Sequence, residues 1–164
     1  MANRDLVWPR TDRELPLAQA FARHVEPLVL RPARGRLNRV FYVFLGGGVG
    51  SVARYLVTLA AARFIAPEFP FGTLIVNLLG CFLIGAVHEV AMMSARLSPE
   101  VRLFLTTGIL GGFTTYSAFN YETLSFFEQG QAARAAGYGS AMILGCAAAG
   151  ALGVWAARSI VGSV

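Results

Sequence analysis

Four apolar stretches limit what this chain can fold into more than any other feature of its sequence. They cover about residues 40–66, 71–93, 101–127 and 136–161. Each is near or above the roughly 20 residues that an α-helix needs to cross a bilayer. The connectors are short, and short links make consecutive helices run antiparallel. The sequence therefore predicts an all-α membrane protein with four transmembrane helices.

The composition supports this class and argues against nucleic-acid binding. Of the 164 residues, 55% are hydrophobic and 14% are charged, whereas soluble domains contain roughly 45–50% apolar residues. All fourteen basic residues are arginine and eight precede residue 40, so the net charge of +5 belongs to the N-terminal tail. A basic segment beside a membrane span is typical of topology control or attraction to anionic lipid. We therefore expect contact with membrane lipid and no nucleic-acid partner.

The chain divides into two predicted parts. Residues 1–37 are polar and arginine-rich, contain four prolines, and lack the apolar core of a signal peptide. They are expected to form a disordered extension, whereas residues 38–164 form the predicted four-helix transmembrane domain. Cys81 and Cys146 lie in apolar runs of that domain, where cysteine acts as a small hydrophobe. Neither a disulfide nor a metal site is predicted from them.

Small residues recur every fourth position in three of the four stretches. The first and third contain the pairs Gly46/Gly50 and Gly108/Gly112, and the last contains Gly137, Ala141, Gly145, Ala149 and Gly153. This spacing puts nearly bare backbone along one helix face, where a second helix can approach closely. We expect tight helix packing or oligomerisation along these faces.

The third stretch contains the segment "TTGILGGFTTYSAFNYE", residues 106–122, which is unusual for a continuous membrane helix. Its paired glycines and threonines predict an interruption within "GGFTT". A helix breaks at membrane depth only where the freed N–H and C=O groups meet protein, water or ions. Carbonyl oxygens favour a small hard cation such as sodium, whereas hydroxyl and amide groups can donate to an anion. The candidate donors are Asn77, Thr114, Thr115 and Ser117.

Three features near this segment have two interpretations each. Arg54, about fifteen residues into the first stretch, either reaches an interface with its long side chain or faces an aqueous vestibule and attracts an anion. Asn77 shares a helix face with Thr73 and either fastens the bundle or donates to an ion. Tyr116 and Phe119, three residues apart, either pack or present their positive ring edges to an anion.

Other function classes are less compatible with the sequence. An intramembrane hydrolase needs a nucleophile beside a base, and His88, the histidine outside the tail, has no such motif, so we predict no enzyme. A small proton-coupled multidrug exporter needs a carboxylate in its first span, and the first stretch contains none. A non-transporting assembly subunit stays open as a third class, with Asn77 and the glycine faces serving packing only.

Three segments, "GGGVGSVARY", "FGTLIVNLLGCFLIG" and "GILGGFTTYSAFNYE", together resemble the Fluc/CrcB family of fluoride channels in order and spacing. The resemblance covers residues 42 to about 160. It implies a channel subunit of four transmembrane helices in the cell's inner membrane, with a broken third helix, that pairs antiparallel into a dimer with two fluoride pores. It also implies a structural sodium ion at the dimer centre and passive export of cytoplasmic fluoride, which gives fluoride resistance.

The resemblance assigns expected roles to individual residues. The backbone carbonyls of Gly111 and Thr114 are expected to bind sodium. The expected ion pathway, in which some of the donors named above are included, consists of Asn77, Thr73, Tyr116, Phe119, Ser117, Thr115 and Tyr138. The expected vestibule contains Arg54 and Glu122.

Three departures from the family pattern affect the expected pore and assembly. Tyr116 stands where the family usually has phenylalanine, and the hydroxyl track of the last helix is reduced to Tyr138, followed by Met142 and Cys146. With the N-terminus inside, eleven arginines would lie on the cytoplasmic side and two outside, whereas an antiparallel homodimer needs little bias. The alternatives are a homodimer in which the extension does not count, and a heterodimer with an oppositely inserted homologue, in which this subunit's own pore is weak or silent.

Overall fold

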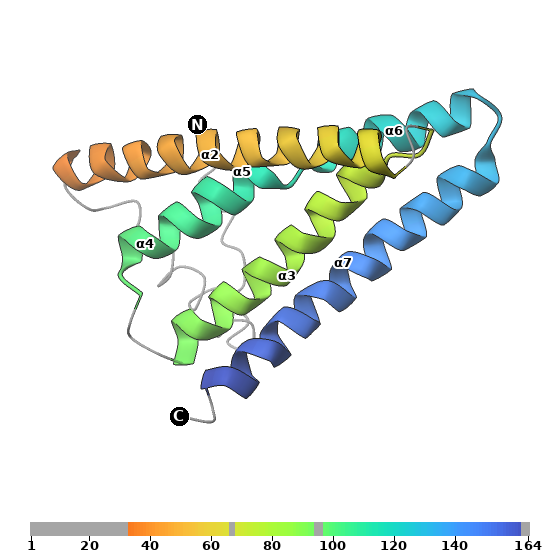
Figure 1. Ribbon diagram of the computed structural model, residues 1–164. Helices are drawn as coiled ribbons and strands as arrows, with labels where there is room; N and C mark the ends of the chain where they lie inside the picture. The colour runs from red at the N-terminus through yellow and green to blue at the C-terminus, as the bar shows by residue number, and fades with distance from the viewer. Residues whose placement is uncertain (1–32, 66–67, 94–96, 162–164) are drawn as a thin grey trace, which may run out of the picture. The chain divides into compact units, whose positions relative to one another are not determined.

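The computed structural model describes residues 33–65, 68–93 and 97–161, and every regular element in these ranges is helical. The long helices are α2 (Ala33–Phe64), α3 (Phe71–Met93) and α7 (Ala132–Val161). In chain order, α3 is followed by α4 (Pro99–Leu103), the π-helix η1 (Phe104–Leu110), α5 (Gly111–Phe113) and α6 (Tyr116–Glu128), and then by α7 (Figure 1). The predicted all-α class is confirmed for these residues.

The chain separates into two units, residues 1–37 and 38–164, and the second is described here by itself. The disorder expected for residues 1–37 falls almost entirely on residues outside the described ranges.

Three helices in the described ranges are long and apolar enough to cross a membrane. They are Leu37–Phe64, Phe71–Met92 and Ala132–Ile160, and they correspond to the first, second and fourth predicted stretches. The third stretch differs, because four short elements follow one another there. Ser98 caps the first of these with its Oγ, which accepts from the Val101 N–H at 3.3 Å, and Pro99 stands at a first-turn position where a missing N–H is harmless.

α3 and α7 run in the same direction and lie side by side (Figure 1). Glycines let their backbones approach each other. A Cβ added at Gly153 would collide with the Phe82 carbonyl oxygen, and one added at Gly85 would collide with the backbone of α7. Near the C-terminal ends of both helices, the Arg158 Nε donates to Glu89 Oε1 at 2.9 Å. Two continuous helices thus pack closely along their glycine-containing faces.

α2 contacts η1 and α5 at similarly close range. A Cβ added at Gly46 would lie 2.8 Å from the Gly108 Cα, and one added at Gly50 would collide with the backbone of η1. The expected close packing of the glycine pairs in the first and third stretches is therefore confirmed. Only part of the row of small residues in the last stretch packs against another helix, because Gly153 faces α3 whereas Gly137 has open space around it.

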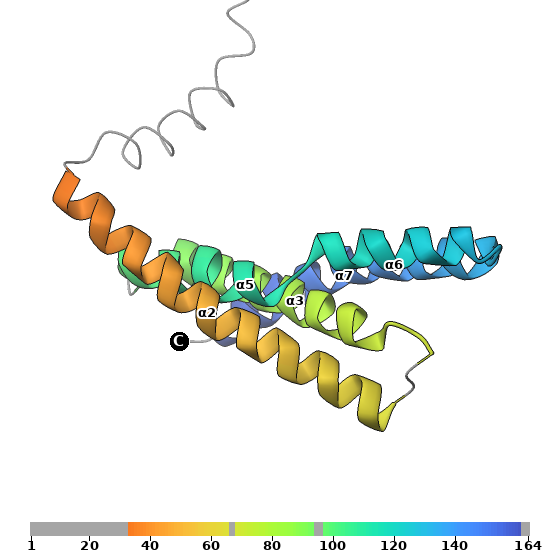
Figure 2. The same cartoon turned by 90° about the horizontal axis from the view of Figure 1, so that it is seen from above.

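α6 lies beside the N-terminal half of α7 (Figure 2). The contact between them is mainly aromatic. Tyr138, only 1% exposed, meets the rings of Phe69, Phe119 and Phe126 edge to face, with centroids 5.4, 5.3 and 6.0 Å away. Interlocked rings of this kind hold α6 in place even though the chain before it leaves the helical path.

Candidate functional site

The chain leaves its helical path between α5 and α6. Thr114 (φ −83°, ψ 158°) and Thr115 (φ −152°, ψ 108°) are both extended, and α6 begins at Tyr116. β-branched threonine suits an extended backbone. Two consecutive extended residues remove the hydrogen bonds that a continuous helix would form across this point. The Thr114 N–H keeps its helical bond to the Leu110 carbonyl at 3.0 Å. The carbonyls of residues 111–114 and the N–H groups that follow them therefore need other partners.

Asn77 on α3 supplies two of these partners. Its Nδ2 donates to the Thr115 carbonyl at 3.1 Å, and its Oδ1 accepts from the Thr115 N–H at 2.8 Å. The side-chain amide thus pairs with Thr115 as a neighbouring β-strand would. Asn77 is 8% exposed, and a primary amide has a second N–H beyond the one used here. This geometry is compatible with both predicted roles, fastening the helices and donating to an ion.

The same contacts release two backbone carbonyls. In a continuous helix the Gly111 carbonyl would accept from the Thr115 N–H, which here donates to Asn77. The Thr114 carbonyl would accept from the Ala118 N–H, which here donates to Thr115 Oγ1, the N-cap of α6, at 3.2 Å. Released carbonyls at the C-terminal end of a helix are partially negative. Gly111 and Thr114 are the two residues expected to bind sodium, and carbonyl oxygens are ligands that suit a hard cation.

Arg54 satisfies the carbonyl that lies between these two. Its Nε donates to the Gly112 carbonyl oxygen at 3.0 Å. A guanidinium at the C-terminal end of α5 interacts favourably with the negative end of the helix dipole. α2 carries Arg54 to this point because Gly46 and Gly50 allow a close approach. Neither predicted role of Arg54, at an interface or in a vestibule, included this contact.

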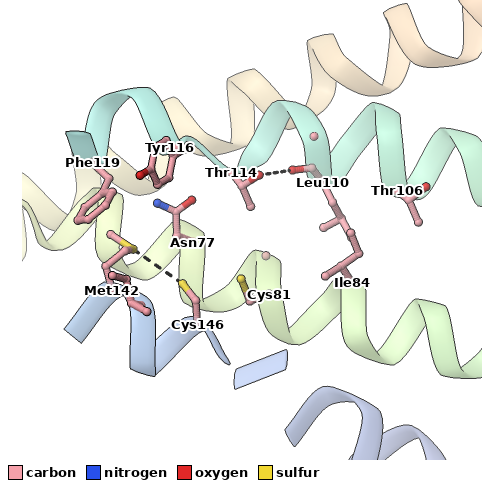
Figure 3. A pocket seen from close by; sticks show the side chains of 13 residues that line it. Asn77, Cys81, Ile84, Thr106, Leu110, Thr114, Tyr116, Phe119, Met142 and Cys146 are labelled. Carbon is pink, nitrogen blue, oxygen red and sulfur yellow. Dashed lines mark hydrogen bonds between the residues drawn. The ribbon is translucent and has the colours of Figure 1, made fainter. Parts of the chain in front are cut away.

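We call Thr114 and Thr115, the two extended residues between α5 and α6, the junction. A cavity of about 410 Å³ lies beside it (Figure 3). Side chains from α3, η1, α6 and α7 line it together with Gly111 of α5, and its surface is mostly apolar. The structure brings five of the predicted site residues to this cavity: Gly111, Thr114, Asn77, Tyr116 and Phe119. Thr115, Ser117, Arg54 and Tyr138 lie around the junction but outside the lining of this cavity.

The rings of Tyr116 and Phe119 meet at the cavity wall. Their centroids are 5.5 Å apart and their planes are inclined by 61°, an edge-to-face arrangement. Phe119 is 7% exposed and also contacts Tyr138 of the aromatic cluster, whereas Tyr116 is 76% exposed. Phe119 therefore packs and lines the cavity at the same time, so both interpretations of this ring are compatible with its position.

A second polar cluster joins α3, α6 and α7. Glu122 Oε1 accepts from Thr73 Oγ1 at 2.7 Å, and its Oε2 accepts from Tyr138 Oη at 2.6 Å. Thr73 and Glu122 line a separate, more polar cavity of about 370 Å³. Thr73 is one helical turn from Asn77, so α3 presents both polar side chains to α6. Of the predicted residues, five thus line the first cavity and two line the second.

Several hydroxyls that were predicted as anion donors form hydrogen bonds within the chain. Thr114 Oγ1 donates to the Leu110 carbonyl at 3.0 Å. Thr115 Oγ1 and Ser117 Oγ share one hydrogen bond of 3.2 Å. In this arrangement the second N–H of Asn77 is the amide donor left at the cavity wall.

The family model described as CrcB-like protein, Camphor Resistance (CrcB), matches residues 41–154 of this chain. The chain belongs to the CrcB family. The match includes α3, the α4–α6 run and most of α7, so the junction and both cavities belong to the CrcB part of the chain. The predicted family is confirmed.

Curated CrcB relatives carry the name fluoride-specific ion channel FluC. The relative from Anaeromyxobacter dehalogenans is 50% identical over 113 residues, which are 69% of this chain and 90% of the relative. The relative from Granulibacter bethesdensis is 54% identical over 62% of this chain and 80% of its own length. The relative from Sorangium cellulosum is 45% identical over 76% of this chain and 98% of its own length.

The CrcB resemblance pointed to the residues around the junction but not to all their partners. Asn77 and Thr115 are 38 residues apart, and Arg54 and Gly112 are 58 apart, so no local pattern reports these contacts. The π-helical geometry of η1 had no signal in the sequence. Met142 and Cys146 follow Tyr138 at the four-residue spacing of the expected pore wall and do line the cavity, whereas no role at this wall was predicted for Cys81.

Proposed function

We propose that this chain is a subunit of a passive fluoride channel, through which cytoplasmic fluoride leaves across the cell's inner membrane. The CrcB match and the relatives named fluoride-specific ion channels support this function. The observation that carries it is the buried amide at the junction, because Asn77 holds the extended Thr115 and also lines the adjacent cavity. The proposal assigns transport rather than catalysis to the chain.

In the proposed channel the α4–α6 run crosses the membrane as a broken helix, the third of four in chain order. Such a break requires partners for its freed backbone groups. Asn77 pairs with Thr115, Arg54 with the Gly112 carbonyl, and the Thr115 hydroxyl with the Ala118 N–H. These contacts support a break that is stable away from water.

The chemistry of the cavity wall suits fluoride. Fluoride is small and accepts hydrogen bonds without donating any, so N–H groups and positive ring edges can replace its water. Asn77, Tyr116 and Phe119 are proposed to provide these groups. None of the three carries a full charge, so the anion is stabilised without being trapped. Beyond Phe119, the Thr73 and Tyr138 hydroxyls that now contact Glu122 are proposed as further donors.

Gly111 and Thr114 are proposed to hold a structural sodium ion with their released carbonyls. A bound sodium ion supplies positive charge next to the negative end of α5. Two oxygens are fewer than a hard cation binds, and Gly111 is exposed. The remaining oxygens are proposed to come from an antiparallel second subunit. If so, replacing sodium by N-methylglucamine in every buffer lowers the dimer fraction in size-exclusion chromatography, and an unchanged fraction contradicts the link.

The second subunit is either another copy of this chain or an oppositely inserted homologue. The arginine distribution favours a single orientation, which supports the heterodimer. A chain that forms dimers and conducts fluoride when expressed alone establishes the homodimer. A chain that conducts only after co-expression with the homologue establishes the heterodimer.

Fluoride efflux from liposomes tests the channel function. The reconstituted chain, alone or with the homologue, is expected to release fluoride and retain chloride, because the larger halide does not fit the narrow path. Empty vesicles provide the baseline. Fluoride release no faster than from empty vesicles, in both preparations, contradicts the proposal.

A further inference from the structure

Three sulfur-containing side chains meet in the wall of the 410 Å³ cavity. Cys81 comes from α3, and Met142 and Cys146 come from α7 (Figure 3). The Cys146 Sγ lies 3.8 Å from the Met142 Sδ. Both cysteines are free thiols of intermediate exposure. The glycine-packed contact between α3 and α7 brings Cys81 to the same wall as Met142 and Cys146, although it is far from them in the sequence.

The proposed passage of fluoride leaves these sulfur groups unexplained. Fluoride is a hard anion, and thiols are weak hydrogen-bond donors. Cys81 follows Asn77 by one helical turn, and the thiols of Cys81 and Cys146 both line the cavity that the proposed ion-facing amide of Asn77 also lines. Thiolate and thioether sulfurs are soft ligands that prefer soft metal ions.

We propose that Cys81, Cys146 and Met142 form a binding site for a soft monovalent metal ion, of the silver(I) or copper(I) class, in the wall of the cavity. The two cysteines bind as thiolates, and each thiol proton leaves to water when the metal binds. Met142 contributes its neutral thioether. No electron is transferred, because silver(I) and copper(I) keep their oxidation state in such a complex.

The position of the site has a consequence for transport, which rests on the proposed channel function. The metal ion lies in the same cavity as Asn77 and Phe119. One monovalent metal ion with two thiolates has a net charge of −1, so the filled site narrows the space beside the amide and repels the anion. Fluoride flux therefore falls when the site is filled. In the described residues no three His, Cys, Asp or Glu side chains gather into a metal-binding group, so the proposed site depends on methionine as well as cysteine.

Silver binding to the purified full-length protein tests the site without any measurement of flux. The protein is incubated with silver nitrate in chloride-free detergent buffer, washed with free methionine, and analysed for retained silver. About one silver ion for each chain is expected. Cys81→Ser and Cys146→Ser are each expected to weaken binding at least about tenfold, and Met142→Leu less than either. Met92→Leu, an exposed methionine outside the cavity, is the matched control and should bind like wild type.

Two outcomes overturn the metal site. One is silver retention in both cysteine variants equal to that of wild type. The other is wild-type protein whose thiols react with N-ethylmaleimide equally fast with and without silver, a measurement that needs no variant and so does not depend on the variants folding. Slowed alkylation in the presence of silver supports the site.

Flux measurements then separate the site from the channel function. Each variant is compared with its own silver-free efflux. Silver is expected to reduce wild-type fluoride efflux at least about tenfold and to leave the efflux of the Cys81→Ser, Cys146→Ser double variant unchanged. Silver that binds wild type without reducing its efflux overturns the placement of the site in the pathway. Absence of efflux before any silver is added contradicts the channel function and leaves the binding result as it stands.

Discussion

α3 and α7 form one kind of helix contact, and the α4–α6 run forms another. α3 and α7 are continuous, so their backbones satisfy themselves and glycines alone let them approach. The α4–α6 run is interrupted at Thr114 and Thr115, and its freed groups are met by side chains from α2 and α3. Close packing therefore needs only the absence of side chains, whereas an interruption needs particular side chains at particular places.

This difference determines how each region responds to substitution. A change in the α3–α7 contact acts through volume, because a new atom meets backbone. A change at the junction acts through unpaired polar groups, because a lost side chain leaves a backbone N–H or C=O without a partner. The junction also lies beside the cavity, so its changes should affect flux as well as stability.

The largest effect is expected from Asn77→Ala, which removes both partners of Thr115. The N–H and the C=O left unpaired each cost about 1–3 kcal/mol. Fluoride efflux is expected to fall to that of empty vesicles while the proposed dimer is retained, because the amide is also lost from the cavity wall. Efflux is normalised to the amount of dimer recovered by size-exclusion chromatography. Asn120→Ala, at an exposed position on α6, is the control, and equal efflux from the two variants would count against the junction's role.

Next in size is Gly153→Ala, which tests the continuous region. Its new Cβ collides with the Phe82 carbonyl, and overpacking of this kind costs about 3 kcal/mol. Gly137→Ala on the same helix has open space and is expected to gain up to about 1 kcal/mol, because alanine favours helix over glycine. Thermal unfolding in detergent measures both. Similar midpoints for the two variants would show that the contact is looser than described.

Arg54→Ala removes the hydrogen bond to the Gly112 carbonyl. A hydrogen bond to a charged group contributes about 2 kcal/mol, so a smaller loss of stability is expected than for Asn77→Ala. Arg54→Lys retains the charge without the planar Nε donor, so its stability should lie between that of wild type and that of Arg54→Ala. Arg63→Ala, exposed near the end of α2, is the control. If Arg54→Lys matches wild type in both stability and efflux, the charge matters and the Gly112 contact does not.

The smallest effect is expected from Thr115→Ala, which removes the N-cap of α6. Loss of such a cap costs about 1 kcal/mol. The Asn77 contacts involve the Thr115 backbone and are retained. Thr115→Ser keeps the capping oxygen and is expected to unfold like wild type. Hydrogen exchange of the first turn of α6 should accelerate in the alanine variant only, and equal exchange in both would exclude the cap as its cause.

Local patterns were enough to predict much of this protein. Apolar length located α3 and α7 within four residues and the end of α2 within two, whereas α2 begins at Ala33, before the predicted start at about residue 40. The four-residue spacing of Gly46 and Gly50 indicated a close helix contact. The family segments led to Asn77, Phe119 and Gly111, which do share one cavity. The hydrogen-bond partner of each polar group could not be predicted from such local patterns. The Thr114 hydroxyl was expected to face an anion and instead donates to Leu110.

The sequence by itself determined the all-α class, the multi-pass membrane character and the family, because apolar length, glycine spacing and short motifs are local properties of a chain. Only the tertiary structure decided that Asn77 pairs with Thr115, that Arg54 reaches Gly112, and that three sulfur atoms share a cavity wall. Those contacts join different helices. Their geometry depends on how closely backbones approach and on which hydrogen bonds a break leaves unmade, and neither is recorded in any single segment.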